Sequence, residues 1–122
     1  MSRLFAPPTP AGVPRSIAQM MDQGKWWKTA DEGWVRIKDL TPAHRLNAAK
    51  GMMRAAATIE FQYGWNVTLM LGNADDGVAG PIMDELDSNS ANPRKWLRKT
   101  KLYRKMIKGL APDMRTEDGA IA

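Results

Sequence analysis

A cluster of basic side chains near the C-terminal end is the feature of this sequence with the clearest potential to bind a ligand. Residues 93 to 110 contain eight basic residues and no acidic one, whereas residues 65 to 92 contain five acidic residues and no basic one. Basic side chains along a helix contact phosphate groups and release their counterions, which gives affinity with little sequence specificity. The sequence therefore predicts a site for nucleic acid or another polyanion.

A helix through this segment would carry the basic residues on one arc and apolar residues on the opposite arc. Asn92 is a suitable N-cap and Pro93 suits the first helical turn, so we expect the helix to start there. Thr100 offers an alternative cap that would divide the segment into two short helices. The residues predicted to bind the anion are Arg94, Arg98, Lys101, Arg104, Lys105 and Lys108.

A solvated helix face is an equally good explanation of the same charges. The acidic residues at positions 65 to 92 could neutralise part of the basic arc. Eight positive charges against five negative ones would still leave a positive surface after complete pairing. The net charge of the whole chain is +5.

No residue pattern in the chain indicates catalysis or metal binding. His44 is the only histidine, and a positive charge on it would oppose the dipole at the start of the predicted central helix. We expect a neutral His44 that orients the junction between a hairpin and this helix. Acidic residues 75 to 87 lack the alternating spacing of a calcium loop, and the absence of cysteine excludes disulfides and zinc–cysteine sites. We therefore expect a protein that is not an enzyme and uses no cofactor or metal.

Three tryptophans, Trp26, Trp27 and Trp34, lie in the segment predicted to form the hairpin. Exposed aromatic rings can stack on the bases of a single strand. Tryptophans clustered in a small domain more often form its core. We expect them to cover the apolar side of the hairpin, with one of the three at an interface with a partner.

The elements that position these residues predict a mainly α-helical domain with a small N-terminal β-hairpin, an α+β fold. Ser16 can cap a short helix over residues 17–22. Apolar and polar residues alternate over residues 34–40, which is typical of a strand with one wet face. Thr41 and Pro42 then predict the start of a helix.

The predicted central helix is rich in alanine, covers residues 42 to 63 and ends at Gly64. Residues 65–71 could form either a strand or a helix, and we favour a helix. A short helix is expected between loops at residues 73–77 and 88–92. The basic amphipathic helix completes the domain.

The chain divides into one folded unit and two flanking segments. Residues 1–15 hold four prolines and few large apolar groups, so we expect a disordered arm. Residues 111–122 are expected to form a flexible tail, which leaves a single small domain over residues 16–110. Its core would be small, so a homo-oligomer or a partner could complete it. No apolar run reaches the length of about 20 residues that spans a membrane, and we expect a cytoplasmic protein.

Two stretches resemble a motif of small bacteriophage proteins of unknown function. The first covers roughly residues 25–54 and contains WKTADEG at residues 27–33 and IKDLTPAHRLN at residues 37–47. It differs from the motif in having Leu40 where a Met is usual and Arg45 between the His and the Leu. The second is NPRKWL at residues 92–97, which is similar to the tail of some actinobacterial-phage relatives.

The resemblance implies a phage accessory protein that acts in the host cytoplasm by binding. Nucleic acid is the first predicted partner. An inhibitor or adaptor that binds an acidic host protein through tryptophan-bearing and basic surface is the alternative. An oligomeric structural component of the phage is a further alternative.

Overall fold

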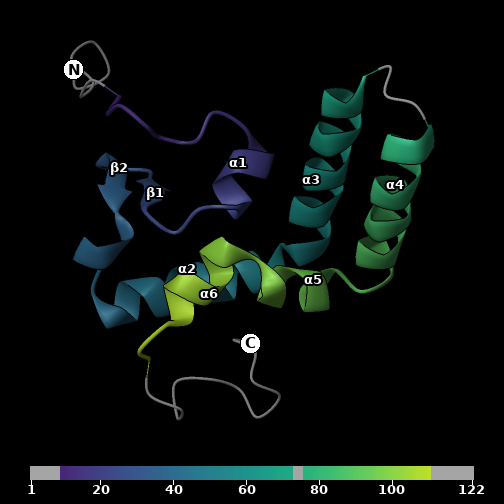
Figure 1. The fold of residues 1–122 in the computed structure, drawn as a ribbon. Helices are drawn as coiled ribbons and strands as arrows, with labels where there is room; N and C mark the ends of the chain where they lie inside the picture. Colours follow the sequence, from purple (N-terminus) through teal and green to yellow (C-terminus); the bar gives the residue numbers. More distant parts are fainter. Residues whose placement is uncertain (1–8, 73–75, 111–122) are drawn as a thin grey trace.

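The computed structural model describes residues 9–72 and 76–110, which form six α-helices and one two-stranded antiparallel sheet (Figure 1). The predicted α+β class is therefore confirmed. Residues 9–15 of the predicted arm contain no helix or strand, whereas residues 1–8 and the whole predicted tail lie outside the described residues. In chain order the elements are α1 (Ile17–Met21), β1 (Trp26–Thr29), β2 (Gly33–Arg36), the short 3-10 helix η2 (Ile37–Asp39), α2 (Pro42–Arg54), α3 (Ala56–Leu71), α4 (Asp76–Ala91), α5 (Pro93–Lys99) and α6 (Lys101–Ile107).

Side-chain caps start three of these helices at the positions that the sequence indicates. Ser16 Oγ accepts from the backbone N–H of Gln19 at 3.1 Å and so starts α1. The Thr41 hydroxyl and the Asn92 side chain do the same for α2 and α5. Each supplies an acceptor for an N–H that has no partner within the helix.

The β-hairpin pairs Trp26 with Arg36 and Thr29 with Gly33. Gly33 has a φ of 72°, a left-handed conformation that glycine adopts without steric cost, and this closes the turn. The predicted strand over residues 34–40 is too long, because β2 ends at Arg36 and η2 follows. The side chain of Ile37, only 1% exposed, joins the core at this point.

The core lies between α2, α5 and α6, with α1 and η2 completing it. The buried cluster consists of Met21, Ile37, Ala49, Met52, Met53, Ala56, Trp96, Leu97, Leu102, Tyr103 and Met106. Arg45 fastens the end of α6 to α2, because its guanidinium donates to the backbone carbonyl of Lys108 at 2.6 Å. A cation at the C-terminal end of a helix also complements the helix dipole.

α3 and α4 lie side by side and project away from this core as a pair (Figure 1). The predicted end of the central helix at Gly64 is wrong: the helix breaks at Ala55, and α3 continues through Gly64 to Leu71. A Cβ atom at Gly64 would lie 3.9 Å from Leu86 Cδ2, so this glycine allows α4 to approach α3 closely. The helical assignment of residues 65–71 is confirmed.

Two further predicted boundaries differ from the structure. α4 is longer than expected, contains Pro81 and includes residues 88–91, which were predicted as a loop. The predicted loop at residues 73–77 lies largely outside the described residues. The single basic helix is also wrong: α5 and α6 are separate, and Thr100, with a ψ of 148°, lies between them as the alternative cap predicts.

Candidate anion-binding site

The break at Thr100 divides the six residues predicted to bind an anion among different surfaces. Arg94 is exposed on α5, and Lys101 and Arg104 are exposed on α6. Lys105 is half-buried and points towards the hairpin, where it packs against Gly24. The two others are Arg98, which is half-buried, and Lys108, which is exposed. The predicted continuous basic arc therefore does not exist as one helix face.

Lys101 and Arg104 line a pocket that also holds carboxylates. This mixed-charge pocket has a volume of about 390 Å³ and lies where α1, α3 and α4 meet α5 and α6. Asp22 and Glu85 contribute its acidic groups. Burial raises the pKa of the neighbouring Tyr63 phenol above its normal value of 10.0, and the charges of Glu85 and Asp22 raise this pKa further. The carboxylates of Glu85 and Asp22 thus offset part of the positive charge here.

A second pocket, which we call the basic pocket, is lined by basic side chains and one glycine. Its residues are Gly24, Lys25, Arg36, Lys38 and Lys105, and its volume is about 160 Å³. Four positive charges come together here with no acidic residue in the lining. An anion placed among them would gain attraction to all four and relieve their mutual repulsion.

Local packing holds the basic pocket in shape. Arg36 Cζ lies 5.3 Å and Lys25 Nζ lies 5.6 Å from the centroid of the Trp26 ring, so both cations rest on this indole. A Cβ atom at Gly24 would lie 3.0 Å from Lys105 Cγ, so glycine makes room for the lysine stem. Gln23 Oε1 accepts from the backbone N–H groups of Lys25 and Trp26 at 2.9 and 2.7 Å, which fixes the entry into β1.

Sequence reasoning found only one residue of this pocket, Lys105. Lys25, Arg36 and Lys38 were missed as binding residues because they lie far from the basic segment in the sequence. Their signal was present in part, since Arg36 and Lys38 alternate with apolar residues and share the wet face of the predicted strand. The contact between Gly24 and Lys105 has no signal in the sequence.

The three hairpin tryptophans do not form one stacking platform. Strand pairing places Trp26 and Trp34 on one face of the hairpin and Trp27 on the other. Trp26 is 9% exposed and lies beneath the cations of the basic pocket. Trp34 is half-buried with Lys28 Nζ 5.7 Å from its ring centroid, and Trp27 is half-buried against the core. Trp26 therefore supports the basic side chains and offers no open ring face for a base.

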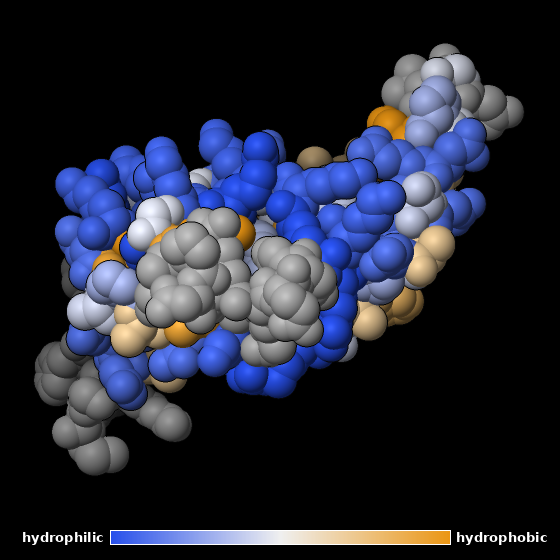
Figure 2. Space-filling view, turned by 90° about the horizontal axis from the view of Figure 1, so that it is seen from below, coloured by the Kyte–Doolittle hydropathy of each residue, from blue (hydrophilic) through white to orange (hydrophobic). Residues whose placement is uncertain are grey.

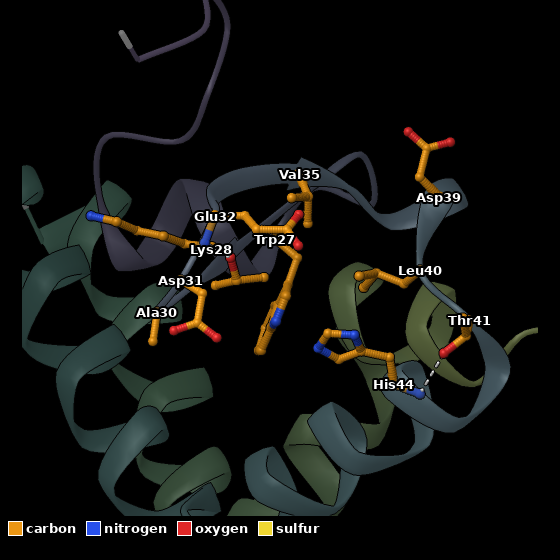
Figure 3. A pocket seen from close by; sticks show the side chains of 11 residues that line it. Trp27, Lys28, Ala30, Asp31, Glu32, Val35, Asp39, Leu40, Thr41 and His44 are labelled. Carbon is orange, nitrogen blue, oxygen red and sulfur yellow. Dashed lines mark hydrogen bonds between the residues drawn. The ribbon is translucent and has the colours of Figure 1, made fainter. Parts of the chain in front are cut away.

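A further pocket lies at the junction of the hairpin and α2, with a volume of about 490 Å³ (Figure 3). Trp27 and His44 point towards each other across it. The hydrogen bond of His44 to Thr41 Oγ1, at 3.2 Å, is made by its backbone N–H and belongs to the helix cap. The lining brings three carboxylates, those of Asp31, Glu32 and Asp39, to the same pocket as His44.

Large apolar side chains are exposed on α3 and α4, a feature that sequence reasoning missed. The exposed side chains are Phe61, Trp65, Leu69, Met70 and Met83. Viewed from below, most of the surface is hydrophilic, and several of the apolar areas lie at the end of the molecule that carries α3 and α4 (Figure 2). The spacing of four residues between Phe61, Trp65 and Leu69 was the available signal.

Across residues 9–72 and 76–110, every helix is too short or too polar to cross a membrane. Within the same ranges no group of three or more His, Asp and Glu side chains could hold a metal ion. The chain matches no protein-family model, no curated protein and no solved structure.

Proposed function

We propose that the protein is a non-catalytic binding protein whose ligand is nucleic acid or another polyanion. The observation that supports this proposal is the basic pocket, where Lys25, Arg36, Lys38 and Lys105 converge from the hairpin, η2 and α6 without an acidic neighbour in the lining. The ligand would be held by its charge and not by its base sequence.

The resemblance of residues 25–54 to small bacteriophage proteins supports a role as a phage accessory protein in the host cytoplasm. The basic pocket uses Lys25, Arg36 and Lys38, all of which lie inside this stretch. The stretch that the resemblance covers thus supplies three of the four basic residues of the proposed site.

Fluorescence anisotropy with labelled duplex DNA over a salt series tests the proposal. Four phosphate contacts predict that log affinity falls with log salt concentration with a slope of about −3.6, since each contact contributes about 0.9. The double variant Arg36→Gln, Lys38→Gln should flatten this slope by about 1.8. A matched control that removes the same net charge from α2 is Lys50→Gln, Arg54→Gln, which should change the slope much less.

The result decides the proposal in either direction. Binding whose slope is reduced by the pocket variant, and not by the α2 control, supports it. Absence of binding at low salt, or binding that is insensitive to salt, rules it out. If the two double variants reduce the salt slope equally, binding depends only on the net charge of the protein and the basic pocket is not the binding site.

Protein binding is a second candidate function, favoured by a separate observation. All the exposed large apolar side chains among the described residues belong to α3 and α4, on an element pair that projects from the core. Exposed apolar area concentrated in one place is typical of a protein-binding surface. This surface differs from the tryptophan hairpin expected from the sequence.

A further inference from the structure

One side of α3 presents an apolar stripe to solvent. Phe61, Trp65 and Leu69 are 70%, 61% and 63% exposed. Because they are four residues apart, they follow one another along the same side of the helix over about 12 Å, at about 1.5 Å per residue. This apolar stripe is distinct from the side of α3 that faces α1, where Asn66 accepts from the backbone N–H of Ala18.

A groove between α3 and α4 continues the apolar stripe. It has a volume of about 170 Å³, and Phe61, Trp65, Met83 and Leu86 form its apolar walls. Thr68 lies in the same groove, with its hydroxyl 3.9 Å from Met83 Sδ and 2.8 Å from the carbonyl of Gly64, which accepts its hydrogen bond. The stripe and groove together are an unpaired face of a two-helix unit.

The charged residues on the two helices of this face are all acidic. No Lys, Arg or His occurs between residues 55 and 92, a stretch that contains six acidic residues. Asp87 is exposed and lines the groove, and Asp84, one turn earlier in α4, is also exposed. Glu60, only 5% exposed, lies in the groove, where its Oε1 accepts from Ser90 Oγ at 2.9 Å.

We propose that this α3–α4 face binds an amphipathic helix that carries Lys or Arg on both sides of an apolar stripe. Apolar side chains of such a helix would cover Phe61, Trp65 and Leu69, and its flanking cations would meet the exposed Asp84 and Asp87. A helix that lies in a groove between two others contacts them through its own apolar residues spaced three and four apart. About two turns of such a helix would pair with the two turns of the stripe on α3.

The same charges disfavour a second copy of this chain as the occupant. In a two-fold symmetric dimer the same patch lies on both sides of the interface, so Asp84 and Asp87 of one copy would approach the equivalent carboxylates of the other. A polyanion is disfavoured for the same reason. The partner of this face is therefore cationic, opposite in charge to the ligand proposed for the basic pocket.

Three labelled synthetic peptides of about 18 residues test the proposal at an ionic strength of about 0.15 M. The first is an amphipathic helix with a Leu stripe and Lys elsewhere, the second has Glu in place of Lys, and the third is a scrambled Leu/Lys sequence without a stripe. We expect saturable anisotropy changes with the first peptide and affinities at least about tenfold weaker for the other two.

Variants locate the binding on the protein. Trp65→Ala and Leu69→Ala should each lower the affinity for the Leu/Lys peptide by about tenfold or more, because side chains at the centre of an interface contribute most of its affinity. Gln62→Ala, at an exposed position of α3 beside the stripe, is the matched control and should bind as the unaltered protein does. Asp87→Asn should weaken binding by a few-fold, unlike Asp39→Asn on η2.

Several results would overturn this proposal without affecting the proposed function. One is the absence of saturable binding of the Leu/Lys peptide, and another is equal binding of the Glu or scrambled peptide. A third is a dimer, detected by sedimentation, that Trp65→Ala converts to a monomer. The dimer result would assign the face to a second copy. DNA binding measured on the same samples keeps the two proposals separate, because Trp65→Ala should leave it unchanged and Arg36→Gln should leave peptide binding unchanged.

Discussion

Replacing Thr100 with valine tests whether this residue separates α5 from α6. The Thr100 hydroxyl oxygen accepts from the backbone N–H of Tyr103 at 3.3 Å and donates to the carbonyl of Leu97 at 2.7 Å. Valine has nearly the same shape and the same branching at Cβ, so Thr100→Val removes both hydrogen bonds with little change in packing. Tyr103 is fully buried, so water cannot readily take the place of the lost acceptor.

The expected loss of stability follows from the two hydrogen bonds. Loss of an N-cap costs about 1 kcal/mol, and loss of an acceptor for a buried N–H raises the total to about 2 kcal/mol. In a domain of this size each kcal/mol corresponds to a fall of about 4 to 8 °C in the melting temperature. Thr100→Ser keeps the hydroxyl and should lose less than about 0.5 kcal/mol.

Urea unfolding followed by circular dichroism measures these differences, with an unchanged m-value as the check that only stability has altered. Thr58→Val, at an exposed position of α3, controls for the substitution itself and should be close to neutral. If Thr100→Val is as stable as the unaltered protein, or if Thr58→Val costs as much, the hydroxyl does not hold the two helices apart and the reasoning is wrong.

Further outcomes are expected for the core, for Tyr63 and for the basic pocket. Met53→Ala, at a position only 1% exposed, should lower the free energy of unfolding by about 2 to 5 kcal/mol in urea titrations, whereas Met70→Ala, at a position 68% exposed, should change it by less than about 0.5 kcal/mol. Because folding raises the pKa of Tyr63 above 10.0, the stability that this phenol contributes is present below pH 10 and falls as the pH rises through its native pKa. Glu85→Gln should lower this pKa only part of the way, since burial is the larger cause, and absorbance titration against a Tyr63→Phe reference checks it. Lys105→Gln should reduce the salt slope of DNA binding by about 0.9, measured by anisotropy.

Local signals in the sequence were sufficient for the fold class and for the starts of α1, α2 and α5. Ser16, Thr41 and Asn92 each carry a side-chain acceptor that acts within three residues, so their effect can be read from the sequence alone. The break at Ala55 has no such signal, because alanine is the best helix former. Its position depends on how α2 and α3 pack against the rest of the core, which is a property of the folded chain. Gly64 led to a wrong prediction because glycine often ends a helix, whereas here its lack of a side chain allows Leu86 of α4 to pack close to α3.

The candidate site could be predicted only in part, for a related reason. The segment after Pro93 was correctly recognised as basic, but the angle between α5 and α6 decides which way each cation points. The side chain of Lys105 lies beside Lys25 and Arg36, away from the other cations of α6, because Gly24 leaves space for its aliphatic part. Contacts of this kind depend on tertiary structure and leave no periodic pattern in the sequence.

The attachment of α4 has a consequence for how the molecule opens. The described part of α4 contributes no residue to the main buried cluster, and its one buried large apolar side chain is Leu86. Exposing that side chain costs about 1.5 to 3 kcal/mol, less than the global stability of a typical domain. The backbone amides of α4 should therefore exchange with solvent through local fluctuations, whereas those of α2 and α6 wait for the whole domain to unfold. We expect this helix to detach and return while the remainder of the protein stays native.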